Sequence, residues 1–199
     1  AHIELERAYA QVKDNGQVNM ALCCDFLSRR LALYTDVEQR YTFEERYAEL
    51  LRYHDASWIN LWSATSAYYH PLRGETDKIP EIFSQHRLSD VNILAPGKPM
   101  MEMIENQVYL ADGAYAKVAG RSAELLAVCE AMHYALVALH IRIQTAAAYE
   151  KLGKSEEAHT WLGRALSDAA PDGLVMPFIE NYERLKPLLT QEIKTELIA

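Results

Sequence analysis

One short pattern occurs twice in this chain, 33 residues apart. An apolar helical stretch runs into Gly120 and restarts at Ser122, and a second stretch runs from Ala146 into Gly153 and restarts at Ser155. Self-similarity at about 34 residues, with a helix, a glycine turn and a second helix in each unit, is typical of a solenoid built from helix pairs. A solenoid presents an extended surface for binding, so the pattern favours recognition over catalysis.

The residue types around the second copy suit two closely packed antiparallel helices. Gly153 can end the first helix with a positive φ, which glycine adopts without steric cost. Ala146 and Ala158 are small enough to let the helices approach closely, while Tyr149 and Leu162 can fill the seam between them. The alternative is an ordinary helical bundle in which similar turns arise by chance.

Helical periodicity extends over most of the remaining chain. A weaker copy of the repeated pattern covers residues 62–74, and a segment with two prolines and a glycine, residues 89–99, interrupts the helices as a loop. Residues 171–173 mark a final break, after which Pro177 suits the first position of a short helix. The stripes that predict the earlier helices are Leu5, Ala8, Tyr9 and Val12; Val18, Leu22, Phe26 and Leu33; Phe43, Tyr47, Leu50, Leu51 and His54; Trp58, Leu61, Trp62, Thr65 and Tyr69; and Ile79, Ile82 and Phe83.

These patterns predict an all-α protein, an antiparallel helix-pair solenoid with a right-handed twist, because strand alternation is not evident. We expect a single helical-repeat domain over residues 1–199. Within it, residues 1–88 form divergent N-terminal repeats, residues 100–170 form clearer repeats, and residues 171–199 form a terminal turn and short helices. The missing initiator methionine suggests that this domain is an excised piece of a longer chain.

Composition and charge argue against several other classes of protein. Of the 199 residues 50% are hydrophobic, enough for one large core or two small ones, but no apolar run of about 18 residues is free of charge, which disfavours a membrane span. The N-terminal residues lack the basic and apolar regions of a signal peptide. The 3 cysteines, an odd number, are expected to be reduced thiols of a cytoplasmic protein. A net charge of −8 argues against direct binding of nucleic acid.

Residues 153–155 resemble part of a phosphate-binding loop, but the residues before them do not match the motif. Gly153, Lys154 and Ser155 resemble the end of such a loop, but the position five residues before Gly153 is Ala148, where the motif needs glycine. A phosphate-binding loop also follows a strand, whereas this segment follows a predicted helix. We therefore interpret it as a turn between helices.

The histidines, cysteines and paired acids do not define a catalytic or metal site. His133 and His140 lie seven residues apart, farther than the four-residue spacing of a two-histidine metal pair. Cys129 could share a metal with His133, but no second pair at a matching spacing completes the site. The acid pairs at residues 44–45 and 156–157 are expected to be solvated. The sequence thus predicts no catalytic residue, metal site or cofactor. We expect that the chain is not an enzyme.

The C-terminal half of the chain resembles a known family. The second copy of the pattern is similar to the tetratricopeptide consensus, and the segment after it resembles the end of the helical-repeat domain in large MalT-like, LuxR-type transcriptional regulators. There the repeats finish in a helix, an acidic Pro-x-Gly turn, then Pro-Phe and a short helix ending in Leu-Leu, and an Arg-Gly-Asp/Glu turn is common earlier. The matching residues are Ala146–Tyr149, Leu152-Gly153, Glu157-Ala158, Trp161-Leu162, Ala165-Leu166, Pro171-Asp172-Gly173, Pro177-Phe178, Leu188-Leu189 and Arg73-Gly74-Glu75.

This resemblance covers roughly residues 100–189 and is thin over residues 1–70. It implies an ATP-dependent regulator similar to STAND ATPases, with a nucleotide-binding module before the repeats and a helix-turn-helix module after them. This sequence shows neither motif, so we expect a sensor and relay domain whose partners include the ATPase and helix-turn-helix modules of the same parent chain. The alternative is a generic tetratricopeptide scaffold that binds a protein and has no role in transcription.

The resemblance also implies where a ligand would bind. In tetratricopeptide repeats the first helix of each pair lines a concave groove, and placing Gly120 and Gly153 at the turns identifies the groove residues. Their mixed small, polar and aliphatic character could hold a peptide helix or a small-molecule effector, and does not distinguish the two. Apolar end faces could also join two copies into a homodimer. The predicted groove residues are Gln107, Leu110, Ala114, Lys117, His140, Ile143, Ala147 and Glu150.

Overall fold

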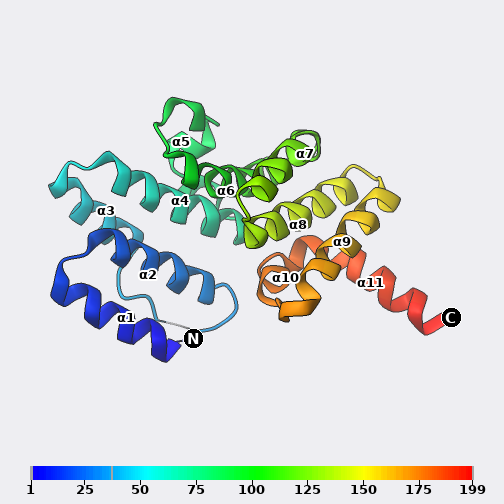
Figure 1. Ribbon diagram of the computed structural model, residues 1–199, viewed down its shortest axis with the longest axis horizontal. Coiled ribbons are helices and arrows are strands. Elements are labelled where there is room, and N and C mark those ends of the chain that lie inside the picture. Colours follow the sequence, from blue (N-terminus) through cyan, green and yellow to red (C-terminus); the bar gives the residue numbers. More distant parts are fainter. Residues whose placement is uncertain (1, 37, 199) are drawn as a thin grey trace. The chain divides into compact units, whose positions relative to one another are not determined.

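The computed structural model describes residues 2–36 and 38–198, and every regular element within them is a helix. The all-α prediction is therefore confirmed for this part of the chain. The chain divides into two compact units, residues 1–93 and residues 94–199, which we describe separately (Figure 1). Among the described helices, none combines the length and the apolar character needed to cross a bilayer.

Unit 1 is built on a hairpin of two helices, α1 (His2–Asn15) and α2 (Val18–Leu31), joined through Gly16 at a φ of 62°. The seam of this hairpin buries Leu5, Tyr9, Val12 and Cys24. Helix α4 packs against α2, α3 and α5. The remaining elements of unit 1 are α3 (Phe43–Leu50), η1 (Leu51–Tyr53), α4 (Ala56–Leu72), η2 (Thr76–Lys78), α5 (Glu81–Ser84) and η3 (Leu88–Asp90).

Polar side chains explain where α3 and α4 begin. The Thr42 hydroxyl accepts a hydrogen bond from the backbone N–H of Glu45 (3.1 Å), and the Glu45 carboxylate accepts one from the N–H of Thr42 (2.8 Å). This reciprocal pair is a capping box. At the start of α4, the carboxylate of Asp55 accepts from the N–H of Ser57 (2.8 Å). Each bond satisfies an N–H that the first turn of a helix leaves without a backbone partner.

Unit 2 is arranged around one central helix. Helix α8 lies between α7 and α9 (Figure 1) and also contacts α6, α10 and α11. Consequently α8 is buried on several sides, and its buried side chains include both aliphatic and polar residues. The elements of unit 2 are η4 (Ala95–Gly97), α6 (Lys98–Ala111), α7 (Tyr115–Ala131), α8 (Ala135–Lys151), α9 (Ser155–Ala169), η5 (Ala170–Asp172), α10 (Met176–Glu180) and α11 (Tyr182–Ile198).

The same turn recurs every twenty residues in unit 2. In each copy one residue has a positive φ, and the N–H of the next residue donates to a carbonyl five positions earlier, as in a Schellman motif. The turn residues are Gly113 (φ 74°), His133 (φ 57°), Gly153 (φ 72°) and Gly173 (φ 61°). The closing bonds run from Ala114 to Tyr109 (2.8 Å), Tyr134 to Cys129 (2.8 Å), Lys154 to Tyr149 (3.0 Å) and Leu174 to Ala169 (3.0 Å).

This spacing corrects the repeat that the sequence suggested. The turn predicted at Gly153 is confirmed, but the turn predicted at Gly120 is wrong, because Gly120 lies inside α7. The counterpart of Gly153 is Gly113, at the end of α6, so one helix pair spans forty residues rather than 33. The apolar residues before Gly120 continue on the same helix after it.

The predicted seam between α8 and α9 is present. Ala146 and Ala158 are fully buried in one core cluster together with Leu162, and Tyr149 packs at its edge. The short alanine side chains let the two helix backbones approach closely while leucine fills the remaining space. Farther along the chain, the predicted short helix is present, but it begins at Met176, so Pro177 is its second residue and not its first.

Two glycine substitutions test which glycine ends a helix. We expect Gly153→Ala to destabilise the protein by about 1–2 kcal/mol, because an L side chain at a positive φ is strained. We expect Gly120→Ala to stabilise it by roughly 0.5–1 kcal/mol, because alanine is the better helix former and an added Cβ would meet no atom within 4 Å. Urea unfolding followed by circular dichroism measures both changes. A loss of stability in both variants would instead support a turn at Gly120.

Candidate functional site

The structure places the predicted groove residues in two environments. The first group is buried inside unit 2 and does not form an open surface: Gln107, Leu110, His140, Ile143 and Ala147. The second group is half-buried or exposed: Ala114, Lys117 and Glu150. The amino group of Lys117 lies 4.3 Å from the centroid of the Tyr109 ring. The predicted set is therefore not brought together on one accessible face.

The C-terminal helices account for part of this burial. Helices α10 and α11 pack against α8, and α11 is also tied to α6. The Gln107 side chain donates to Asn181 (3.2 Å), and Arg184 donates to the side-chain oxygen of Gln107. On α8, Gln144 donates to the backbone carbonyl of Met103 on α6 (2.9 Å). Polar side chains thus hold α6, α8 and α11 together where the sequence predicted a ligand groove.

We call the buried region where α6, α8 and α11 meet the inner layer. Some buried side-chain amide atoms of α6 and α8 have no hydrogen-bond partner among the described residues. Neither side-chain atom of Asn106 forms a hydrogen bond, and the side-chain oxygen of Gln144 accepts none. Both residues are fully buried. A buried amide without a partner costs free energy, on the order of 1–3 kcal/mol. The inner layer of unit 2 therefore contains polar groups that a different side-chain arrangement, or a bound molecule, could satisfy.

A cavity in unit 2 lies beside α8. It has a volume of about 550 Å³ and lies between the C-terminal end of α7, the N-terminal half of α8, and the segment from the end of α9 through η5. This volume falls in the range of ligand sites, about 300–1,000 Å³. Its apolar lining includes Leu126, Ala138, Leu139 and Leu174. We call it the α7–α9 groove.

The charges around the α7–α9 groove are mostly acidic. Arg142 and Asp168 form an ion pair across it (2.8 Å), so these two charges neutralise each other. Glu130 and Asp172 are exposed and form no ion pair with another described residue. His133, the turn residue with positive φ, also lines the groove. The groove therefore has an apolar floor and an excess of negative charge at its rim.

The groove lining includes one thiol, that of Cys129. Burial raises the pKa of the Cys129 thiol, which keeps the thiol protonated and poorly nucleophilic. Among the described residues, no group of three or more His, Cys, Asp and Glu side chains is placed to hold a metal ion. The geometry is suited to non-covalent binding.

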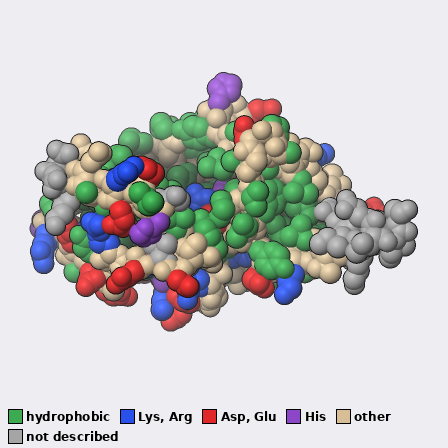
Figure 2. All heavy atoms as spheres, turned by 90° about the horizontal axis from the view of Figure 1, so that it is seen from below, with side chains coloured by type: hydrophobic (Ala, Val, Ile, Leu, Met, Phe, Trp, Pro, Cys, Tyr) green, Lys and Arg blue, Asp and Glu red, His purple; other side chains and the backbone are tan. Residues whose placement is uncertain are grey.

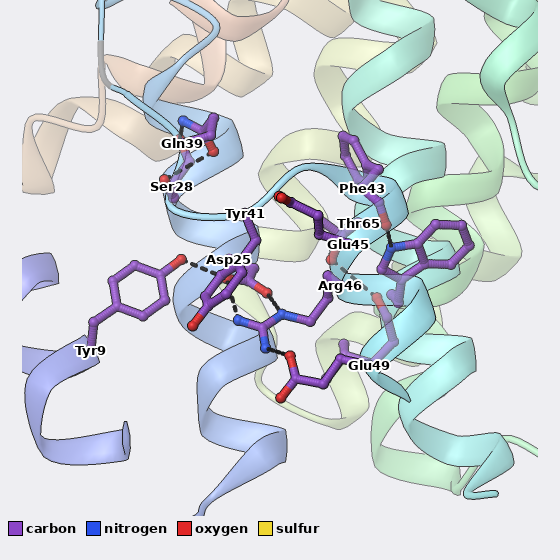
Figure 3. A network of polar contacts seen from close by, with 12 residues as sticks. Tyr9, Asp25, Ser28, Gln39, Tyr41, Phe43, Glu45, Arg46, Glu49 and Thr65 are labelled. Atoms are coloured by element: carbon purple, nitrogen blue, oxygen red, sulfur yellow. Dashed lines mark hydrogen bonds and ion pairs between the residues drawn. The ribbon is translucent and has the colours of Figure 1, made fainter. Parts of the chain in front are cut away.

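Unit 1 contains a buried ionic network, shown in Figure 3. The Asp25 carboxylate on α2 accepts from the Tyr9 hydroxyl on α1 (2.6 Å) and from Nε of Arg46 on α3 (2.5 Å). Arg46 also donates to Glu49, and its guanidinium lies 4.0 Å from the centroid of the Tyr41 ring. Burial, followed by the charge of Asp25, raises the pKa of Tyr9. The network joins three helices and leaves each charge paired, so its role is structural.

A second polar cluster lies at the end of α4. The ring nitrogen Nδ1 of buried His70 is 2.8 Å from Glu75, which also pairs with Arg73 (2.9 Å) and Lys78 (3.1 Å). These contacts, led by the hydrogen bond from Arg73, lower the pKa of Glu75 to about 2. Burial lowers the pKa of His70, although Glu75 opposes that shift. Both shifts make the folded state sensitive to acid.

Comparison of this chain with protein-family models, curated proteins and solved structures finds no match. The geometry of the two units is therefore the basis for a functional assignment.

The sequence patterns did not identify the α7–α9 groove. Its ion pair joins Arg142 and Asp168, which lie on different helices at a spacing without any motif. Its exposed acids, Glu130 and Asp172, look like ordinary solvated charges in the sequence. Cys129 and His133 are close in the sequence, so their proximity is predictable. Only the packing of α7 against α8 shows that both residues line one cavity.

The ionic network of unit 1 predicts a large effect for Asp25→Asn. We expect a loss of about 3 kcal/mol in unfolding free energy, because the substitution leaves the buried Arg46 guanidinium without its principal counter-charge. As a control, Glu4→Gln removes the exposed Arg7–Glu4 pair and should change stability little. Urea unfolding of both variants, followed by circular dichroism, makes the comparison. Equal effects of the two substitutions would show that the network does not stabilise unit 1.

The His70 cluster predicts that unit 1 loses stability in acid. Because the folded-state pKa of His70 is below its unfolded value of about 6.5, its contribution is present above that pH and declines as pH falls below it. Glu75 adds a further loss as pH falls from about 4.5 towards about 2.

Urea unfolding between pH 7.5 and 5.5 tests the histidine contribution. In a Trp161→Phe background the fluorescence reports Trp58 and Trp62, which both lie in unit 1. We expect His70→Gln to flatten the pH dependence, because glutamine can still donate to Glu75 but does not titrate. His2→Gln, at an exposed residue, serves as the control. An unchanged slope in His70→Gln would contradict the assignment.

Proposed function

We propose that unit 2 is a tetratricopeptide-like solenoid and that this chain is the sensor and relay domain of a MalT-like, LuxR-type bacterial transcriptional regulator. The observation that carries this proposal is a turn that recurs every twenty residues, each time with one residue in the left-handed conformation. These turns form the successive hairpins α6–α7 and α8–α9. Helix α11 then packs on α8 and α9, as the first helix of a further pair would. Repeated helix hairpins that stack on one another are the basis of solenoid folds.

The repeat in unit 2 is longer than a tetratricopeptide repeat. A pair in unit 2 spans forty residues, longer than the tetratricopeptide period of about 34 residues and closer to the roughly 40–47 residues of armadillo-type and HEAT repeats. The proposal therefore rests on the helix-pair architecture and on the C-terminal resemblance, and not on the repeat length.

The residues of the C-terminal resemblance have defined structural roles. Pro171 lies in η5, Gly173 takes the left-handed conformation that ends this segment, and Pro177 lies in the first turn of α10. Leu188 is fully buried in the core cluster shared with α8 and α9. The resemblance to the end of a regulator's repeat domain thus concerns residues that shape the terminal turn and its packing.

A relay role is supported by the polar contacts in the inner layer. The Gln107–Asn181 bond joins α6 to the segment between α10 and α11, although the two residues are far apart in sequence. An effector that binds one arrangement of α6, α8 and α11 more tightly than another would shift their equilibrium. In the proposed regulator that shift would reach the neighbouring ATPase module through the displaced helices.

The alternative function is a protein-interaction scaffold without a transcriptional role. It is favoured by exposed apolar side chains at the C-terminal end of unit 2, where Val175, Ile179 and Tyr182 are 59%, 42% and 47% exposed. Exposed apolar residues that lie close together are typical of a surface that another protein covers. Either function uses unit 2 for recognition.

The sequence that flanks this chain in its gene tests the transcriptional role. We expect a phosphate-loop ATPase encoded upstream and a helix-turn-helix encoded downstream, because the sensor acts only through these modules. Sequencing the gene on both sides is the measurement. A complete open reading frame without either module would exclude the regulator and leave the scaffold.

Thermal-shift measurements on the purified chain test whether it senses a small molecule. A library of sugars, amino acids and nucleotides should contain a class that raises the melting temperature in a saturable manner, because a ligand at about 100 times its Kd stabilises the folded state by about 2.7 kcal/mol. If no compound produces a saturable shift, the effector is not a small molecule of these classes.

A further inference from the structure

We infer that the α7–α9 groove is a docking site for a basic amphipathic helix of a partner protein. It shares no residue with the ligand groove that the sequence predicted. Its failure as a docking site would therefore leave the proposed effector function intact. Three properties of the groove support this occupant: its apolar floor, its unpaired acids, and the exposed apolar residues that continue from it.

The floor suits aliphatic anchors. Ala138 and Leu139 of α8 lie at the base of the groove, with Leu126 of α7 and Leu174 after η5 around them. An amphipathic helix binds by inserting side chains at i, i+3, i+4 and i+7 into such a depression. The volume of about 550 Å³ accommodates several aliphatic side chains.

The apolar surface extends beyond the groove itself. Leu174 lines the groove, and the next residue, Val175, is 59% exposed. Ile179 follows one turn later on α10, which contacts α8. Figure 2 shows hydrophobic side chains gathered on one face of the molecule. A bound helix longer than the groove could therefore bury further apolar surface on α10.

The charges select a basic partner. The acidic and basic side chains that line the groove are Glu130, His133, Arg142, Asp168 and Asp172. Arg142 is neutralised by Asp168 at 2.8 Å, which leaves Glu130 and Asp172 as the charges without an ion pair among described residues. Lysine or arginine on the flanks of a docked helix would meet these two carboxylates. Such complementarity mainly sets orientation and the rate of encounter.

The N-terminus of α8, which lies in the groove, favours an acidic rather than a basic partner. Helix α8 begins here at Ala135, and its N-cap residue Tyr134 makes no side-chain capping bond. The free N–H groups of a helix N-terminus attract anions, with an effective charge of about half a unit. Two full carboxylate charges outweigh this term, so the groove prefers a cation. An acidic peptide of matched hydrophobicity tests that balance directly.

Fluorescence anisotropy with the full 199-residue chain and two labelled probes tests the inference. The first probe is an amphipathic peptide of about four helical turns made of leucine and lysine, and the second replaces each lysine with glutamate. We expect saturable binding of the lysine probe and at least roughly tenfold weaker binding of the glutamate probe. Added salt should weaken binding of the lysine probe. Equal affinity of the two probes, or no saturation, would overturn the inference.

Matched variants show whether binding occurs at this groove. Glu130→Lys with Asp172→Lys should weaken the lysine probe by roughly tenfold. Glu156→Lys with Glu157→Lys makes the same change in net charge at exposed residues outside the groove lining and should have a much smaller effect. Equal loss in both double variants would mean non-specific attraction to an acidic protein, and would overturn the site.

A steric variant keeps the test independent of charge and of folding defects. Ala135 is exposed and lines the groove, so Ala135→Trp can fill the groove without disturbing the core. We expect it to reduce affinity for the lysine probe by at least tenfold while circular dichroism and the melting temperature stay as in the parent. Retention of full affinity by a folded Ala135→Trp protein would overturn the inference.

Discussion

Unit 2 depends on one backbone constraint, a residue with positive φ after each of the helices α6, α7 and α8 and after the segment formed by α9 and η5. That residue turns the chain back on itself, and the N–H that follows it closes the turn on a carbonyl of the preceding helix. Because the turn recurs every twenty residues, the hairpin formed by α6 and α7 is repeated by α8 and α9. Glycine adopts this conformation freely at Gly113, Gly153 and Gly173, whereas His133 must accept steric strain of about 1–2 kcal/mol. The packing of α7 against α8, with the bond from Tyr134 to Cys129, offsets that strain.

The regular turns place α8 at the centre of unit 2, and this position decides which surfaces remain available for binding. Helices α6 and α11 both pack against α8, and Arg184 of α11 donates to Gln107 of α6, while Gln144 of α8 donates to the backbone of α6. The side next to the ends of α7 and α9 stays open and forms the α7–α9 groove. A helix of mixed aliphatic and polar residues can thus contribute to a closed inner layer and to an accessible groove at the same time. In unit 1, an ion pair between Asp25 and Arg46 joins α2 to α3.

Much of the helical architecture could be predicted from local patterns, because its signals are local. The turn at Gly153 and the small residues Ala146 and Ala158 predict a hairpin and its close seam, and the structure contains both. Gly120 was assigned wrongly, because a glycine after an apolar stretch looks the same whether the helix ends or continues. Here α7 continues, since Gly120 is exposed on the helix and nothing opposes its helical conformation. The sequence does not predict the turn at His133, because histidine seldom adopts a positive φ.

Local sequence patterns predict the helical class, the turn at Gly153 and the break near Gly173, since each follows from the conformational preferences of a few adjacent residues. Which polar residues are buried, and which charges face a cavity, depends on how the helices pack. Gln107 meets Asn181, and Arg142 meets Asp168, because separate helices pack together. Such contacts depend on the relative rotation of whole helices, which local periodicity leaves undefined. For that reason the sequence predicted a binding protein, whereas the position of an accessible groove became visible only when the packing around α8 was known.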